Sequence, residues 1–217
     1  MLKLYGFSKV NAGARGHTRD LRVLWALEEM QMPFEVAGMD HPAHDLSTEA
    51  YRRLSPFEQI PSIDDDGVVL SESGAILVYL AKKSGRFIPG DRAGEAQVAR
   101  WCFAALDTVE MPLLALMVHD WTAAASSGSN DKPREFLVGW VNRVFTNLER
   151  WLAGREFVAT NDFTVADILM AHVLSAGIKD VGLIAPYPGV AAYRDRCLAR
   201  PAWKRTIDAY YARVEAG

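Results

Sequence analysis

The first part of the chain alternates between strand-like and helix-like spacing of apolar side chains. Leu2–Phe7 alternates as a half-buried strand does. Residues 21–29 instead carry apolar side chains at helical spacing, at Leu21, Leu24, Trp25 and Leu27. A second strand begins at Phe34, directly after Pro33. The order strand, helix, strand predicts a βαβ unit.

A β-hairpin and a second helix are predicted next. The runs Ser62–Asp64 and Val68–Leu70 flank Asp66-Gly67, a dipeptide typical of tight hairpin turns. After Ser71-Glu72-Ser73 the spacing becomes helical, with apolar side chains at Ile76, Leu77, Tyr79 and Leu80.

The remainder of the chain has helical spacing without a clear strand. Ile88–Asp91 is typical of a linker. Residues 93–121 form a long apolar segment, in which Pro112 should bend the helix. The order of elements predicts an α/β domain over residues 1–84 and an all-α domain over residues 91–217.

One helix of the second half begins with a capping signal. Thr164 is placed as N-cap, with Asp167 three residues later, and Phe163 and Ile168 have the spacing of a hydrophobic staple. This segment should serve folding rather than chemistry. We expect Thr164→Ala or Asp167→Ala to cost about 1–2 kcal/mol, as a lost helix cap does.

Composition and charge exclude several classes of protein. A net charge of −3 provides no basic surface for nucleic acid. The amino terminus starts with a strand rather than a signal peptide, and no apolar run reaches transmembrane length. We therefore expect a cytoplasmic protein without a membrane partner. Cys102 and Cys197 lie far apart and the five histidines are scattered, so neither a disulfide nor a metal site is expected.

Two neighbouring segments carry groups suited to holding a small peptide. Ile60-Pro61 precedes the first hairpin strand, where a cis bond would leave the Ile60 backbone groups able to pair with an extended peptide. Glu72-Ser73 starts the next helix, whose N–H groups and positive dipole end favour a carboxylate at Ser73. Glu72 can pair with an ammonium group. An ordinary turn and a helix cap are the alternatives.

Together these residues resemble the glutathione transferase superfamily, and the resemblance covers essentially the whole chain. It implies a thioredoxin-like first domain in which Ile60 and Pro61 hold the cysteinyl backbone of glutathione. Glu72 and Ser73 are implied to hold the γ-glutamyl group, with Gln59 as a further contact. The implied reaction is attack by the glutathione thiolate on a small hydrophobic electrophile, performed by a homodimer.

The residue that activates the thiol is expected near the start of the first helix. Thr18 is favoured because residues 18–23 resemble the Ser-Arg-Ser-Leu-Arg-Val sequence of many bacterial transferases; Thr18 could also simply cap that helix. The predicted loop over residues 6–20 contains no cysteine, which removes most support from mechanisms that need a protein thiol there. The other candidates for this role are Ser8, Asn11 and His17.

The electrophile is expected to meet apolar side chains of the second domain, although core packing is an alternative for most of them. The candidates are Met111, Leu114, Met117, Val118, Trp121 and Tyr210. Other functions left open are glutathione-dependent isomerisation, reduction of peroxides or mixed disulfides, and a non-catalytic binding or regulatory role.

Overall fold

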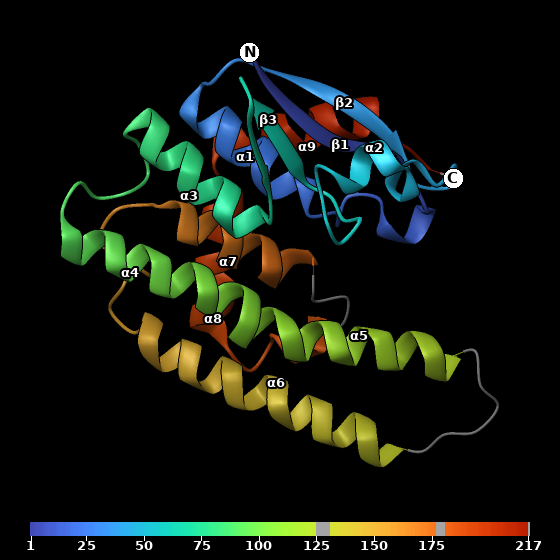
Figure 1. Cartoon of the computed structure of the whole chain (residues 1–217). Helices are drawn as coiled ribbons and strands as arrows, with labels where there is room; N and C mark the ends of the chain where they lie inside the picture. The colour runs from blue at the N-terminus through green and yellow to red at the C-terminus, as the bar shows by residue number, and fades with distance from the viewer. Residues whose placement is uncertain (125–130, 177–180, 217) are drawn as a thin grey trace. The chain divides into compact units, whose positions relative to one another are not determined.

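The computed structural model describes residues 1–124, 131–176 and 181–216, and its chain forms two compact units (Figure 1). The first unit consists of Met1–Pro89 together with Ala199–Gly217, and the second of Gly90–Leu198. The fold confirms the predicted α/β thioredoxin-like domain followed by a helical domain. The all-α domain was expected to cover residues 91–217, whereas the second unit ends at Leu198 because the final helix packs on the first unit.

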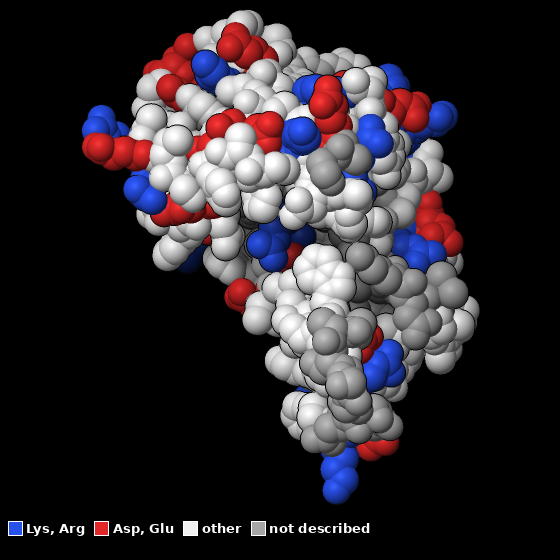
Figure 2. Space-filling view, turned by 90° about the vertical axis from the view of Figure 1, so that its right-hand side faces the viewer, with Lys and Arg blue, Asp and Glu red and all other residues white. Residues whose placement is uncertain are grey.

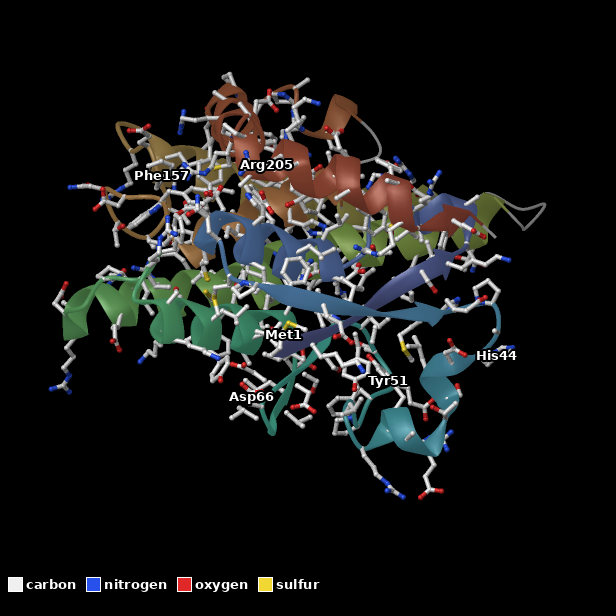
Figure 3. All side chains as sticks on the ribbon, turned by 90° about the horizontal axis from the view of Figure 1, so that it is seen from above. Met1, His44, Tyr51, Asp66, Phe157 and Arg205 are labelled. Carbon is white, nitrogen blue, oxygen red and sulfur yellow. The ribbon has the colours of Figure 1, made fainter. Side chains whose placement is uncertain are left out.

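A mixed sheet forms the centre of the first unit. Its strands are β1 (Leu2–Val10), β2 (Phe34–Asp40), β3 (Ser62–Asp65), β4 (Val68–Ser71) and the short β5 (Glu215–Ala216). Strand order is β2-β1-β3-β4, with β1 and β2 parallel and the other two pairs antiparallel. The predicted hairpin is therefore present, and Figure 3 shows Asp66 at its turn beside Met1, whose ammonium group donates to the Asp66 carboxylate at 2.6 Å.

The first strand is longer than predicted. It continues past Phe7 to Val10, with an irregularity in its pairing with β2 between Phe7 and Lys9. Its end is also paired in parallel with β5, through Lys9 with Glu215 and Val10 with Ala216. Local sequence gives no sign of this pairing, because the partner strand lies at the other end of the chain.

Helices cover the sheet of the first unit. They are α1 (Asp20–Met30), α2 (Glu49–Arg52), α3 (Ser73–Ser84) and α9 (Pro201–Arg213), with short 3-10 turns η1 (Ala12–Ala14) and η2 (Asp45–Ser47). Helix α1 packs against both α3 and α9, and nearly all of its side chains are buried. An apolar stripe on a single helix face is enough for a surface helix, whereas α1 is enclosed on several sides.

Helix α9 is held on α1 by charged and aromatic contacts. Arg200 binds the Glu29 carboxylate with both Nε and Nη2, at 2.6 and 2.9 Å. Arg205 pairs with Glu28, and the rings of Trp25 and Trp203 lie 4.9 Å apart. The bidentate pair to Glu29 has the planar geometry in which an arginine–carboxylate contact is strongest. These contacts explain why residues 199–217 belong to the first unit.

The second unit is helical over its described residues. Its elements are α4 (Arg92–Phe103), η3 (Ala104–Val109), α5 (Glu110–Ala124), α6 (Asp131–Leu152), α7 (Val165–Ala176), η4 (Val181–Leu183) and α8 (Pro188–Leu198). Helix α7 packs against α4, η3 and α8, and its side chains from Val165 to Leu174 are almost completely inaccessible to solvent. It is the core helix of this unit.

The expected distortion near Pro112 takes the form of a π-helical turn on its amino-terminal side. Helix η3 is this turn, and the N–H of Glu110 bonds to the carbonyl of Ala105, five residues earlier. In a regular α-helix the ring of Pro112 would meet the carbonyl of Thr108 and leave it without its N–H partner. The wider turn lies immediately before that position.

The helical stretch Arg92–Ala123 is also long and apolar enough to cross a membrane when judged by length and composition alone, contrary to the sequence-based expectation. Its most apolar window has a mean hydropathy of 1.5, and 39% of that window is buried inside the protein. Core helices of soluble proteins pass the same test, so this is weak evidence. On the face shown in Figure 2, acidic and basic side chains are interspersed over the surface.

The start of α7 contains the predicted capping contact. The Asp167 carboxylate accepts from the backbone N–H of Thr164 at 2.9 Å and from its hydroxyl at 3.0 Å. The same carboxylate also accepts from the backbone N–H of Val158 and from the Tyr193 hydroxyl, both at 2.9 Å. Asp167 therefore joins three segments of the second unit in addition to capping one helix.

Candidate functional site

Strand register brings the segments expected to hold the tripeptide to one end of the sheet. Ser62 pairs with Ser71 across the hairpin, so Ile60-Pro61 and Glu72 adjoin the same end of the β3–β4 ladder. Tyr5 pairs with Ser62 on the other side, which places the carboxyl-terminal half of β1 at that end as well. Residues that are far apart in sequence thus meet where a strand ends and a helix begins.

The Ile60–Pro61 peptide bond is cis. The Ile60 side chain is buried in a cluster with Leu46 and Tyr51. The hydroxyl of Tyr51, labelled in Figure 3, donates to the carbonyl of Gln59 at 2.8 Å, and the Gln59 side chain is exposed. The segment before β3 is therefore anchored from inside the unit.

Glu72 has a backbone conformation that is unusual for a residue with a side chain. Its φ is 70° and its ψ is 112°, whereas non-glycine residues rarely adopt positive φ. Its carboxylate is exposed next to the start of α3. Backbone strain of this kind costs of the order of 1–3 kcal/mol and concentrates at ligand-binding positions.

Ser73 is the first residue of α3 and only 5% exposed. Its hydroxyl oxygen accepts a hydrogen bond at 3.2 Å from Arg22 Nη1, and Arg22 is itself 2% exposed on α1. Because the oxygen already accepts from Arg22, the hydroxyl proton can be donated to a ligand. The helix start, the hydroxyl and the guanidinium together form a site suited to a carboxylate.

Sequence reasoning missed Arg22. A signal was available, since Arg22 directly follows Leu21 on a helix predicted to be buried, and a buried arginine requires partners. Its partner lies 51 residues away, so only the packing of α1 against α3 identifies it.

Thr18 is 8% exposed, two residues before the start of α1. Its hydroxyl donates to the Tyr210 hydroxyl at 2.8 Å, and its carbonyl accepts from the N–H of Leu21 at 3.2 Å. The alternative candidates are dispersed. Ser8 lies within β1, Asn11 is exposed just before η1, and His17 is exposed in the following turn.

Asp20, two residues after Thr18, is the first residue of α1 and is completely buried. Its Oδ2 accepts from the N–H of Phe7 at 3.0 Å, whereas its Oδ1 is buried with no hydrogen-bond partner among the described residues. Burial raises the pKa of Asp20, while the nearby Thr18 hydroxyl, the Phe7 N–H and the charge of Arg213 oppose the rise.

The electrophile candidates come from both units. Helix α5 carries five of them: Met111, Leu114, Met117, Val118 and Trp121. Met111, Val118 and Trp121 are exposed, and Trp121 reaches 60%. Tyr210 instead lies on α9 in the first unit, is 0% exposed, and contacts Thr18. Phe103, 69% exposed at the end of α4, is a further exposed apolar side chain that sequence reasoning missed.

The described residues offer neither a metal-binding cluster nor an exposed thiol. Within residues 1–124, 131–176 and 181–216, no three His, Cys, Asp or Glu side chains are grouped in a way that could hold a metal ion. Both cysteines are buried in the second unit, and burial raises the pKa of the Cys102 thiol to about 12.

Comparison with known proteins identifies the family. The model of the glutathione S-transferase N-terminal domain matches residues 12–82, and that of the C-terminal domain matches residues 109–201. The chain belongs to the glutathione S-transferase family. Glutathione S-transferase 3 of Schizosaccharomyces pombe is 30% identical to it over 86% of this chain and 81% of that protein.

Two further relatives differ in their described chemistry. A disulfide-bond oxidoreductase of Escherichia coli is 27% identical over 81% of this chain and 84% of that protein. A glutathione transferase family member from Pseudomonas fluorescens, solved with two glutathione molecules bound, has a TM-score of 0.83 and 25% identity. That alignment covers 95% of this chain and 92% of the solved chain.

Proposed function

We propose that this protein binds glutathione and directs its thiolate at a small hydrophobic electrophile. The observation that carries the proposal is the strained start of α3. There, Glu72 presents an exposed carboxylate beside Ser73, whose hydroxyl is supported by Arg22. The glutathione bound to the Pseudomonas fluorescens relative supports the same ligand.

Each end of the γ-glutamyl group has a matching partner in this arrangement. The ligand carboxylate would accept from Ser73 and from N–H groups at the start of α3, close to the positive charge of Arg22. The ligand ammonium would pair with Glu72. Ile60-Pro61, at the same end of the hairpin, would hold the cysteinyl backbone, and the exposed Gln59 would contact the peptide from the neighbouring position.

The reaction requires the thiolate form of glutathione. A free thiol has a pKa of about 8.5, so a hydrogen bond donated to the sulfur increases the reactive fraction at neutral pH. We assign this donation to Thr18. The sulfur then attacks an electrophilic carbon and a sulfur–carbon bond forms. The bond between that carbon and its leaving group breaks, and the leaving group departs with the electron pair of the broken bond.

Ser73→Ala tests the carboxylate site. It should weaken glutathione binding by about 1–3 kcal/mol, because a charged group loses a hydrogen-bond partner. Titration calorimetry measures this directly, with Ser84→Ala at the other end of α3 as the matched control. Equal affinity of the Ser73→Ala variant and the wild type would overturn the assignment.

Glu72 permits a test that separates binding from strain. Glu72→Ala and Glu72→Gly both remove the carboxylate and should both weaken glutathione binding. Only glycine also relieves the positive φ, so the Gly variant should be more stable than the Ala variant by about 1 kcal/mol. Ala and Gly variants that differ in glutathione affinity but have the same stability would contradict this interpretation of Glu72.

Thr18→Val tests the thiol donor, since it keeps the shape and removes the hydroxyl. The rate should fall by about ten- to a thousand-fold at neutral pH, with glutathione affinity nearly unchanged. Thiolate absorbance followed against pH should show a raised pKa for the bound thiol. An unchanged titration would move the role to Ser8, Asn11, His17 or a backbone amide.

A second candidate function is reduction of a disulfide by two glutathione molecules. The Escherichia coli relative and the two glutathione molecules bound to the Pseudomonas fluorescens relative favour it. Two glutathione thiols would give up two electrons and two protons, yielding glutathione disulfide and two substrate thiols. Turnover of a model disulfide, but of no alkyl or aryl electrophile, would select this function. Binding without any turnover would select a non-catalytic role.

The exposed apolar side chains of α5 are proposed to contact the electrophile, and the active form is proposed to be a cytoplasmic homodimer. Trp121→Ala should change the preference among hydrophobic electrophiles while leaving glutathione affinity intact. Sedimentation equilibrium should give a dimer, and a monomer throughout the micromolar range would refute that assembly.

A further inference from the structure

The carboxy-terminal segment of the chain is hydrogen-bonded to the loop that precedes α1. Arg15 Nε donates to the carbonyl of Val214 at 2.7 Å, and Arg15 Nη2 donates to the carbonyl of Tyr211 at 2.8 Å. The Arg15 guanidinium also lies over the Tyr211 ring, 5.0 Å from its centre. The position of this loop therefore depends on residues almost two hundred positions later in sequence.

Gly16 shows how close this approach is. Its φ is +86°, and a Cβ atom at this position would lie 2.1 Å from the Tyr211 hydroxyl oxygen. The positive φ favours glycine, and a side chain at this position would displace the Tyr211 ring. The loop and the Tyr211 side chain of α9 therefore lie in close contact.

Tyr210 forms the innermost contact between the two segments. It is fully buried, and its hydroxyl accepts from Thr18 at 2.8 Å. The single Thr18 proton can serve only one acceptor at a time.

Thr18 and Tyr210 are both hydroxyls, and each can donate or accept. If the Thr18 proton turns away from Tyr210, the Tyr210 proton can turn toward Thr18 and preserve the same 2.8 Å hydrogen bond. A chain of donors polarised in one direction strengthens its terminal hydrogen bond.

We propose that Tyr210 is a positioning residue for the thiol donor, holding the Thr18 oxygen and donating to it when the Thr18 proton turns to a bound thiolate. This inference rests on the proposed function and on the assignment of Thr18 within it. No covalent bond changes in this step; only the direction of one hydrogen bond reverses.

The charged groups around the pair are Asp20 on α1, Arg213 on α9 and Arg15 on the loop. Burial raises the pKa of Tyr210, as does the charge of Asp20; the hydrogen bond from Thr18 and the charge of Arg213, whose guanidinium lies 5.8 Å from the ring centre, oppose them. A tyrosine hydroxyl is ordinarily protonated at neutral pH, as a donor to Thr18 must be.

Tyr210→Phe tests the proposal because it keeps the ring and removes one oxygen. We expect the apparent pKa of bound glutathione, measured by thiolate absorbance, to rise by about 0.5 to 1. The value of kcat/KM should fall roughly three- to tenfold at neutral pH and approach the wild-type value at high pH. Glutathione affinity should remain within about twofold, as expected for a residue that acts through another.

Three further variants make the result specific. Tyr79→Phe removes a tyrosine hydroxyl bonded to Asp65 in the same unit and should leave the thiolate titration unchanged. In a Thr18→Val background, Tyr210→Phe should cause no additional change in the titration. Arg15→Met releases the loop without touching Tyr210 and provides a second route if the Phe variant does not fold. It too should raise the pKa of the bound thiol.

The outcomes separate this inference from the proposed function. A wild-type protein that binds no glutathione, or binds it without a thiolate signal, overturns both. A wild-type thiolate whose pKa is unchanged or lowered by Tyr210→Phe overturns the role of Tyr210 alone. An equal effect of Tyr210→Phe in the Thr18→Val background would also overturn it, because the effect would not pass through Thr18.

Discussion

Replacing Asp167 should destabilise the protein by more than the loss of a helix cap. Its carboxylate accepts four hydrogen bonds, from the N–H groups of Val158 and Thr164 and from the hydroxyls of Thr164 and Tyr193. In Asp167→Ala the two hydroxyls can rotate toward other acceptors, whereas the two backbone N–H groups cannot. Each buried N–H left without a partner costs about 1–3 kcal/mol. We therefore expect a total of about 3–5 kcal/mol, above the 1–2 kcal/mol typical of a cap.

Urea denaturation followed by tryptophan fluorescence measures this cost as a shift of the midpoint at constant slope. Tyr193→Phe removes one of the four donors and should cost about 1–2 kcal/mol; Thr164→Ala should cost a similar amount. The double variant Asp167→Ala/Tyr193→Phe should then lose less stability than the two single variants lose together, because both changes remove the same contact. A loss of about 2 kcal/mol or less for Asp167→Ala, no more than a helix cap provides, would refute the reasoning.

Two other predictions concern buried groups. Cys102 and Cys197 are both buried, so a disulfide reagent should label neither until urea unfolds the protein; rapid labelling in native buffer would contradict the structure. Burial alone would raise the pKa of Asp65, but hydrogen bonds from Lys83 and Tyr79 lower it overall. The stability it contributes is therefore present above the unfolded value of 3.8 and is lost as the pH falls through the lower folded value. Lys83→Met should thus flatten the acid limb of the stability curve, whereas Lys82→Met should not; equal acid limbs in wild type and Lys83→Met would argue against this ion pair.

The sequence predicts well those features that depend on neighbouring residues. The turn at Asp66-Gly67 fixes the hairpin, and the change from strand to helix spacing after Leu70 fixes the start of α3 within two residues. Residues 60 and 61 are placed by the same short-range signals. Their positions could be predicted because each signal lies within a few residues of the element it specifies.

Contacts between distant segments could not be predicted in this way. Arg22 and Ser73 are 51 residues apart, and Thr18 and Tyr210 are 192 apart, so packing alone brings each pair together. Helical spacing also identifies which residues of α9 are buried without showing which core they enter. The buried positions Ala202, Thr206 and Tyr210 have the same four-residue period whether the helix packs on the first or the second unit.

The position of α9 therefore matters for chemistry as well as for folding. The groups proposed to hold glutathione, from Ile60 to Ser73, lie on one hairpin and the helix that follows it. The proposed thiol donor lies instead on a loop whose hydrogen bonds run to residues 210–214. In the proposed function, binding and activation of glutathione would therefore depend on different parts of the chain, joined through α1. Changes in the last helix should accordingly alter the reactivity of the bound thiol while sparing its affinity, and changes near Glu72 should do the reverse.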